Sequence, residues 1–137
     1  MKRILTIALV LCMLVGIMAP LASAFSDVAD SPEKEYISTL AEKGIVKGYN
    51  ADTFAPDKLC TREQFITFLY RAAGEPEVIV ADEFADMRDA DDYAKAAMKY
   101  YKSKGAIEGV GNNKFLPQAN ITRAEAVVMV AKCLEVK

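Results

Sequence analysis

An internal repeat is the feature that most limits how this chain folds. When the sequence is shifted by 61 positions, seven of the 20 residues from position 43 to position 62 meet an identical residue. The matched pairs are Lys43 and Lys104, Gly44 and Gly105, Gly48 and Gly109, Phe54 and Phe115, Pro56 and Pro117, Thr61 and Thr122, and Arg62 and Arg123. Upstream, Phe25-Ser-Asp27 matches Phe84-Ala-Asp86 at an offset of 59. Such repeats are typical of stacked supersecondary units that cannot bury their apolar faces alone.

Each copy predicts a first helix that ends at a glycine. In copy one, Ser31 is the predicted cap and Pro32 the first helical residue. The predicted apolar stripe is Tyr36, Ile37, Leu40 and Ala41, at helical spacing. In copy two the helix begins near Asp91 and buries Ala94, Ala97, Met98 and Tyr101. Gly44 and Gly105 are expected to end these helices in the left-handed conformation.

A loop and a second helix follow in each copy. Phe54 and Phe115 are expected to pin the loops to the core, and Gly48 and Gly109 are expected to serve backbone conformation. Thr61 to Gln64 and Thr122 to Glu125 both predict a capping box at a helix start. The predicted buried faces are Phe65, Phe68, Leu69 and Ala72 in copy one, and Ala126, Met129, Val130 and Cys133 in copy two. The fold class is therefore mainly α.

The first 24 residues have the pattern of a secretory signal peptide. Lys2 and Arg3 precede an almost wholly apolar run from Ile4 to Met18, and Ala22-Ser23-Ala24 supplies the small residues of a cleavage site. A membrane anchor is the alternative, but the run of about 15 residues is shorter than the roughly 20 that a spanning helix needs. The expected organisation is a signal peptide over 1–24, repeat one over 25–73, a linker over 74–83 and repeat two over 84–137.

Composition excludes several classes of function. The chain has 137 residues, no His, no Trp and a net charge of −2, which becomes −4 once Lys2 and Arg3 are removed. Without His there is no Ser-His-Asp or Cys-His catalysis and no His-ligated metal. A chain of pI ≈ 5.2 lacks the basic face that nucleic-acid binding requires. We therefore expect a non-catalytic protein with no cofactor, no metal, no nucleic-acid partner and no membrane contact after cleavage.

Two cysteines follow the predicted cleavage site, Cys60 and Cys133. In an exported protein they could form a disulfide that closes a loop of 72 residues. The alternative is that both are small buried hydrophobic residues. The sequence leaves both possibilities open, because it cannot test the geometry that a disulfide needs.

The ordered set of repeated motifs resembles the S-layer homology (SLH) domain. Copy one supplies Phe25-Ser-Asp27, Gly44-Ile-Val-Lys-Gly48, Phe54-Ala-Pro56 and Thr61-Arg62-Glu63. Copy two supplies Phe84-Ala-Asp86, Gly105-Ala-Ile-Glu-Gly109, Phe115-Leu-Pro117 and Thr122-Arg123-Ala124-Glu125. The resemblance covers nearly all of residues 25–137 and implies two helix-loop-helix repeats packed side by side as an incomplete three-part spindle. The family often has three repeats, and this sequence has two.

The resemblance also implies a function and a set of binding residues. It implies an exported module that anchors to the bacterial cell wall by binding an anionic, pyruvylated secondary wall polysaccharide in grooves between repeats. The residues that it assigns to the ligand are Asp27, Arg62, Asp86, Tyr93 and Arg123. At the position of Tyr93, where the family often has Trp, copy one has Pro32. The glycines and the capping residues Thr61 and Thr122 are expected to be structural.

The positions of Arg62 and Arg123 also suit the binding of an anion on physical grounds. Each is predicted at the first position of a helix, where a cation opposes the helix dipole at a cost of about 0.3–1 kcal/mol. A carboxylate bound there meets free amides, the dipole and a bidentate guanidinium together. The alternative for each Arg is an ion pair with a nearby carboxylate such as Asp27 or Asp86. Those carboxylates have the alternative role of capping or bracing the first turn, and Tyr93 is either a sugar-stacking residue or a core tyrosine.

Association with another chain is the alternative function. Two repeats leave an open docking face where a third would pack, and its apolar surface would be buried by a second copy or by another SLH chain.

Overall fold

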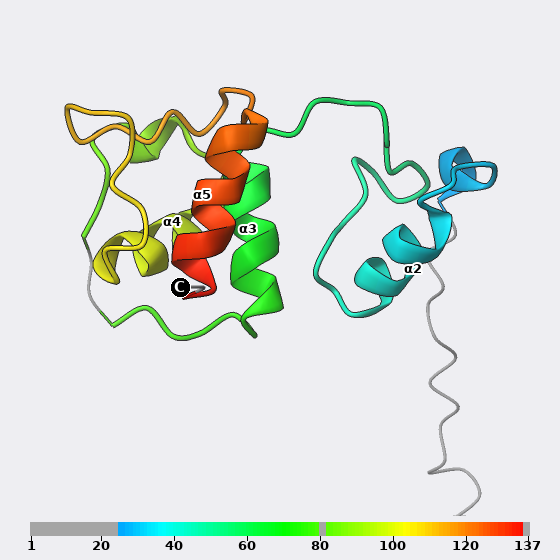
Figure 1. Ribbon diagram of the computed structural model, residues 1–137, viewed down its shortest axis with the longest axis horizontal. Helices are drawn as coiled ribbons and strands as arrows, with labels where there is room; N and C mark the ends of the chain where they lie inside the picture. The colour runs from blue at the N-terminus through cyan, green and yellow to red at the C-terminus, as the bar shows by residue number, and fades with distance from the viewer. Residues whose placement is uncertain (1–24, 80–81, 136–137) are drawn as a thin grey trace, which may run out of the picture.

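The computed structural model describes residues 25–79 and 82–135, so the predicted signal peptide lies outside the described residues (Figure 1). These residues form four α-helices, two short 3-10 turns and one isolated β-bridge. The elements in chain order are η1 (Ser26–Val28), α2 (Lys34–Glu42), α3 (Arg62–Ala72), η2 (Met87–Asp89), α4 (Asp92–Ser103) and α5 (Arg123–Cys133). The prediction of a mainly α fold is confirmed.

The predicted capping boxes start both second helices. The Thr61 hydroxyl accepts from the Gln64 amide, and the Gln64 side chain accepts from the Thr61 amide. Thr122 and Glu125 repeat this exchange at α5. The first helix of copy one differs slightly from prediction, because α2 begins at Lys34 rather than Pro32. The predicted cap at Ser31 is therefore wrong: the N-cap position is Glu33, and the Ser31 hydroxyl accepts from the Glu33 amide at 3.2 Å in the turn before the helix.

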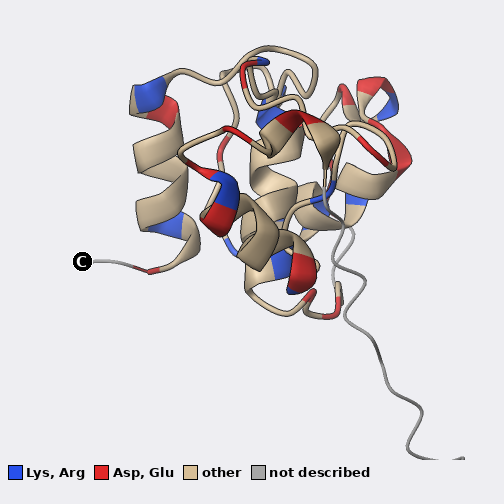
Figure 2. Cartoon of the chain, turned by 90° about the vertical axis from the view of Figure 1, so that its right-hand side faces the viewer, with Lys and Arg blue, Asp and Glu red and all other residues tan. Residues whose placement is uncertain are grey.

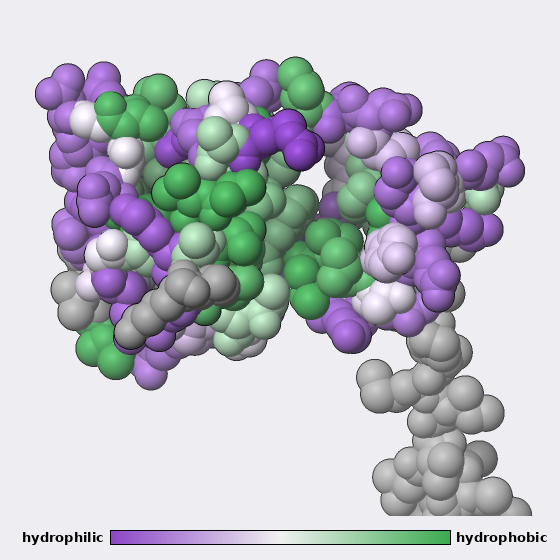
Figure 3. Space-filling model, viewed as in Figure 1, coloured by the Kyte–Doolittle hydropathy of each residue, from purple (hydrophilic) through white to green (hydrophobic). Residues whose placement is uncertain are grey.

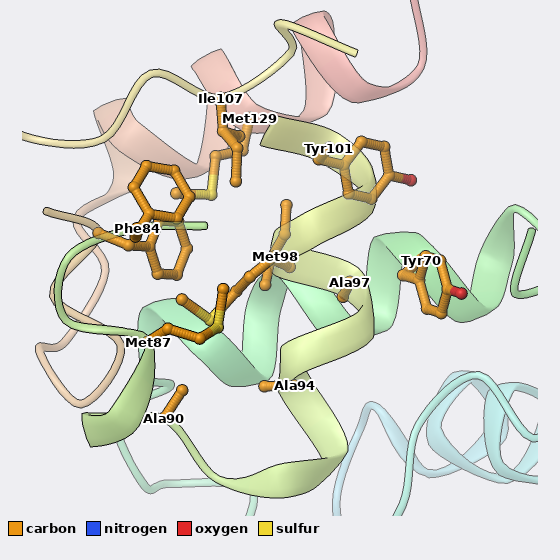
Figure 4. Close-up of a cluster of buried hydrophobic side chains, with 12 residues drawn as sticks. Tyr70, Phe84, Met87, Ala90, Ala94, Ala97, Met98, Tyr101, Ile107 and Met129 are labelled. Carbon is orange, nitrogen blue, oxygen red and sulfur yellow. The ribbon is translucent and has the colours of Figure 1, made fainter. Parts of the chain in front are cut away.

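The main hydrophobic core lies among α3, α4 and α5 (Figures 1 and 4). In α4 the predicted residues Ala94, Ala97, Met98 and Tyr101 are all buried, at 0 to 2 % exposure. Met129 of α5 and Phe115 of the preceding loop complete this core, Phe115 with no exposed surface. The second helix of copy one therefore packs in the core of copy two, against both α4 and α5.

A separate and smaller cluster holds α2. Phe25, Val28 and Ile37 form its buried part, with Ala41 and Phe54 packed against them. The predicted stripe of α2 is wrong for Tyr36 and Leu40, which are 73 % and 38 % exposed. The physical reason is that α3, which would be the natural neighbour of α2, packs on copy two instead.

The buried face of α3 also differs from prediction. Ile66, Thr67 and Tyr70 are buried together with the charged Arg62 and Glu63. The predicted residues Phe65 and Leu69 pack at the edge of the core, whereas Phe68 is only half-buried and Ala72 is exposed. Apolar side chains cover more than half of this helix, so periodicity alone did not locate the stripe that faces α4.

The two long loops have the same backbone design. The carboxylate of Asp27 accepts the amides of Phe54 and Ala55 at 2.9 and 2.7 Å. Asp86 accepts the corresponding amides of Phe115 and Leu116 at 3.0 and 2.8 Å. The residue after each phenylalanine has a positive φ, 63° at Ala55 and 57° at Leu116. Each Asp therefore braces a strained turn in the long loop, 27 to 30 residues further along the chain, rather than the first turn that the sequence suggested.

Neither Cys60 nor Cys133 is in a disulfide; both are free and half-buried. Cys133 packs against the main core. Burial raises the pKa of the Cys133 thiol to about 12, which keeps it protonated at neutral pH. The structure thus agrees with the interpretation of these cysteines as small hydrophobic residues.

Two glycines with similar φ but different surroundings give a testable prediction about stability. Gly109 has φ +80°, and an added Cβ would lie 2.2 Å from the Lys114 carbonyl oxygen. Gly105 has a similar φ of +67°, but nothing lies within 4 Å of its added Cβ. Gly105→Ala is expected to cost about 1–2 kcal/mol of stability from the left-handed backbone alone. Gly109→Ala should cost clearly more, as measured by urea unfolding, and equal losses would contradict the steric argument.

The brace at Asp27 predicts a pH dependence. The Phe54 amide, followed by the Ala55 amide, holds the pKa of this carboxyl below its usual value of 3.8. Because the folded pKa is depressed, the stabilisation is complete above the unfolded pKa and is lost as pH falls through the folded value. NMR titration of the Phe54 and Ala55 amides should give a midpoint below 3.8. That transition should be absent in Asp27→Asn, and a midpoint at or above the usual value would refute the brace.

Candidate functional site

The start of α3 docks on the loop that precedes α5. The Arg62 and Glu63 amides donate to the carbonyls of Ala119 and Pro117 at 2.9 and 3.1 Å. Thr61 and Asn120 form an isolated antiparallel bridge, extended by a bond between the Ile121 amide and the Cys60 carbonyl. These contacts satisfy two amides that a helix start leaves without intrahelical partners. They join copy one to copy two.

Arg62 is the central side chain of this junction. Its side chain is 5 % exposed, its Nε donates to the Phe115 carbonyl at 2.7 Å, and its guanidinium lies 4.8 Å from the centre of the Phe115 ring. Its Nη1 also pairs with Glu125 at 2.5 Å. Sequence reasoning predicted the position of Arg62 but named Asp27 and Asp86 as its alternative partners. The structure instead pairs it with the capping glutamate of the other copy.

Glu125 connects the capping box to the repeat junction. One of its oxygens accepts from the Thr122 amide and hydroxyl, and the other accepts from Arg62. The Thr122 amide, then the Thr122 hydroxyl, and lastly the charge of Arg62 lower the pKa of Glu125. The carboxylate is therefore ionised at neutral pH and holds α5 beside α3.

A pocket of about 280 Å³ lies at this junction. Residues 106–110 of the copy-two loop line one side, and α5 lines the other with Ala124, Val128 and Met129. Arg62 and Lys132 bring cations to it. Glu125 and Glu108 bring carboxylates, which pair with Arg62 at 2.5 Å and with Lys132 at 3.4 Å. Copy two lines nearly all of this pocket, and Arg62 is the lining residue that copy one contributes.

Arg123 differs sharply from its counterpart Arg62. It occupies the first position of α5, as predicted, but its side chain is exposed. Within residues 25–79 and 82–135 it forms no ion pair, and neither its amide nor that of Ala124 donates a hydrogen bond. Figure 2 shows α5 at the edge of the molecule, with a cationic residue at its start. This site offers an unpaired cation and free helix amides to an anion.

Tyr93 lies at a second junction, between α3 and α4. Its hydroxyl donates to the buried Glu63 at 3.0 Å, and Glu63 also accepts from the Asp91 amide and the Gln118 side chain. Burial and this hydrogen bond raise the pKa of Tyr93. The ring is nevertheless 45 % exposed. The predicted binding residues are therefore not all in contact: Tyr93 bonds to Glu63, Arg62 bonds to Phe115 and Glu125, and Asp27 bonds to the copy-one loop.

Sequence reasoning missed Glu63 and Gln118. Glu63 is only 1 % exposed and satisfies three donors from copy two, so it fixes how α3 meets α4. The available signal was an asymmetry between the copies. At the repeat offset, Glu63 corresponds to Ala124 and Tyr93 corresponds to Pro32. The carboxylate and its hydroxyl partner are therefore both missing from the equivalent positions of the other copy.

The comparisons with known proteins agree with the repeat organisation. The family profile of the S-layer homology domain matches residues 24–66 and 83–127. The chain is 37% identical over 101 residues to Endo-1,4-beta-xylanase A of Thermoanaerobacterium saccharolyticum, covering 74% of this chain and 9% of that protein. It is 33% identical over 115 residues to Cellulosome-anchoring protein of Acetivibrio thermocellus, covering 81% and 26%. It is 28% identical over 143 residues to Surface layer protein of Brevibacillus choshinensis, covering 98% and 13%.

The chain corresponds to about a quarter or less of each of these relatives. A location at the cell surface or cell wall, expected from the sequence, agrees with the family and with the names of these relatives. None of the described helices has the length and apolar character to span a membrane. With two profile matches in the predicted positions and the repeated loop geometry, the chain belongs to the S-layer homology domain family.

Proposed function

We propose that this chain is a non-catalytic cell-wall anchoring module that binds an anionic secondary wall polysaccharide at the start of α5. The observation that carries the proposal is Arg123, an exposed guanidinium at the first position of an 11-residue helix. It adjoins Ala124 and Glu125, which line the pocket at the repeat junction. The ligand group that suits this position is the carboxylate of a pyruvylated sugar.

The electrostatics of α5 favour an anion here. A free cation at a helix start costs about 0.3–1 kcal/mol, and a bound carboxylate reverses the sign of that contribution. The amides of Arg123 and Ala124 point along the helix axis toward such a ligand. The net charge of −4 expected for residues 25–137 provides no long-range attraction to an anionic wall, so binding rests on local contacts.

The other predicted ligand residues have supporting roles in this proposal. Arg62 and Asp86 both contact the backbone of Phe115 and hold the loop that borders the pocket. Asp27 does the same for the loop of copy one. Tyr93 presents a half-exposed ring that suits stacking on a sugar. Copy one has Pro32 at the position of Tyr93 and so has no equivalent ring. In this proposal the sugar is therefore bound by copy two.

The relatives support an anchoring rather than a catalytic role. One is named for anchoring and one as a surface layer protein. The xylanase shares with this chain only about a tenth of its length, so its name describes a protein far larger than the shared region.

The alternative function, association with another chain, is favoured by a different observation. Apolar side chains are exposed on α2 and α5, among them Tyr36 and Val127 at 73 % and 69 %. This alternative rests on helix faces, whereas wall binding rests on a helix start.

Co-sedimentation with purified wall sacculi tests the wall-binding proposal. Residues 25–137, which hold every described element, should bind intact sacculi and not sacculi stripped of secondary polysaccharide. Arg123→Ala should weaken binding by about tenfold or more, the usual value of a charge-assisted contact. Arg88→Ala is the matched control, since Arg88 is 89 % exposed and belongs to the same copy. Equal binding to both preparations, or equal losses in both variants, would contradict a carboxylate site at α5.

Tyr93 gives a separate prediction about the sugar. Tyr93→Phe keeps the ring and removes the bond to Glu63, so it should lower stability by about 1 kcal/mol and leave wall binding near wild type. Tyr93→Ala removes the ring and should weaken binding by about fivefold to tenfold, as loss of an aromatic contact does. Sacculus binding and urea unfolding of both variants separate the two effects. Unchanged binding in a folded Tyr93→Ala protein would exclude stacking.

A further inference from the structure

The interface between α3 and α4 shows which faces of the repeat are built to meet. Glu63 at the start of α3 bonds to the Asp91 amide and the Tyr93 hydroxyl at the start of α4. Tyr70 near the end of α3 packs against the rings of Tyr100 and Tyr101 near the end of α4, at 5.6 and 6.5 Å between centroids. The two helices therefore contact each other near both their starts and their ends.

Ile66 and Thr67 of α3 lie on the same helical stripe as Glu63 and Tyr70, and they are 0 % and 1 % exposed. On α4 the residues opposite include Ala97 and Tyr101, at 0 % and 2 %. These four residues mark a fully buried contact between one second helix and the following first helix.

Each of these four buried residues has an exposed counterpart at the equivalent position of the other copy. Ile66 and Thr67 correspond to Val127 and Val128 of α5, which are 69 % and 52 % exposed. Figures 2 and 3 show the middle of α5 free of charge and its outer face hydrophobic. Ala97 and Tyr101 correspond to Tyr36 and Leu40 of α2, which are 73 % and 38 % exposed. The chain therefore presents both halves of its own internal contact, each without its counterpart.

The polar anchors repeat in the same way. Within the chain, the Arg62 amide, the Glu63 amide and Arg62 Nε donate to the carbonyls of residues 119, 117 and 115. The corresponding donors are the amides of Arg123 and Ala124 and the side chain of Arg123. The corresponding acceptors are the carbonyls of Lys58, Pro56 and Phe54 in the copy-one loop. Among residues 25–79 and 82–135 none of these donors or acceptors is in a hydrogen bond.

The copy-one loop is already shaped to receive such a helix. Asp27 and Asp86 brace the two loops through equivalent amides, and Ala55 and Leu116 share the same positive φ. Next to this loop, Leu59 is 75 % exposed at the position that corresponds to Asn120, the bridge partner of Thr61. An apolar residue at this position suits an interface that is covered when a partner binds.

We propose that α5 of one copy docks on α2 and the residue 54–60 loop of a second copy, as α3 docks on α4 and the residue 115–121 loop. This proposal rests on the association alternative above and does not depend on wall binding. The contact is head-to-tail, so each copy uses one face and leaves the other free, and assembly proceeds to a ring or an open chain. Within one chain α5 packs beside α3 and contributes Met129 to the core that it shares with α4, away from α2 (Figure 1).

The contact between copies is weaker than the internal one. Glu63 and Tyr93, which bond across the internal interface, correspond to Ala124 and Pro32, which cannot form that bond. The docked helix is then held by apolar contacts and by the Arg123 donors. Because this contact lacks the Glu63–Tyr93 hydrogen bond, we expect the copies to associate weakly, so that the fraction associated depends strongly on protein concentration.

A pair of complementary variants tests the proposal. Val127→Asp disables the α5 face and Tyr36→Asp disables the α2 face, both at positions exposed enough for the fold to tolerate a charge. Sedimentation velocity of residues 25–137 should show wild-type mass rising between about 1 and 300 µM, the range of weak interfaces. Each variant alone should associate at least tenfold more weakly. An equimolar mixture should form a one-to-one dimer, because Val127→Asp keeps an intact α2 face and Tyr36→Asp an intact α5 face.

Several outcomes would overturn this assignment. The proposal is wrong if the wild type stays monomeric at every concentration. It is also wrong if the single variants associate like the wild type, or if their equimolar mixture forms no dimer. Ile79→Asp, an exposed residue outside both faces, is the control and should behave as wild type. Circular dichroism checks that each variant is folded. Sacculus binding is measured in parallel, so loss of association with intact wall binding, or the reverse, separates this proposal from wall anchoring.

Discussion

The docking of the α3 start onto the copy-two loop is the contact on which the rest of the structure depends. Arg62 bonds to the Phe115 carbonyl and to Glu125, while the first amides of α3 bond to the loop carbonyls. This places Ile66 and Tyr70 in the main core and positions Glu63 against α4. A buried guanidinium is tolerated because its charge is paired and hydrogen-bonded. Loss of Arg62 would leave Glu125 and the Phe115 carbonyl without their partner.

This arrangement makes the two copies unequal in spite of their similar sequences. The first helix of copy two shares the main core with both second helices, α3 and α5. The first unit of copy one has only its small cluster around Phe25, Val28 and Ile37. The same asymmetry explains why Arg62 is sequestered whereas Arg123 is exposed. A residue type at a repeated position therefore has a structural role in one copy and is available for binding in the other.

The two proposed interactions meet at the same residue. Arg123 is the cation offered to a wall carboxylate, and it is also the donor that would reach the loop of a second copy. A ligand at the start of α5 and a docked neighbour would compete for its guanidinium and for the two free amides. If both proposals hold, each interaction weakens the other, because both use the start of α5.

The sequence by itself determined where the helices begin and end, because helix starts and ends depend on residues within about one turn of each other. Thr61 with Gln64 and Thr122 with Glu125 cap their helices because the partners lie within one turn, and Gly44 and Gly105 end α2 and α4 with positive φ. The repeat determined the family and the equivalence of the two loops. Which helix packs on which was decided only by the tertiary structure, because an apolar stripe does not specify its partner. The burial of Arg62 and Glu63, the exposure of Tyr36, and the availability of Arg123 all follow from α3 packing on copy two rather than on its own first helix.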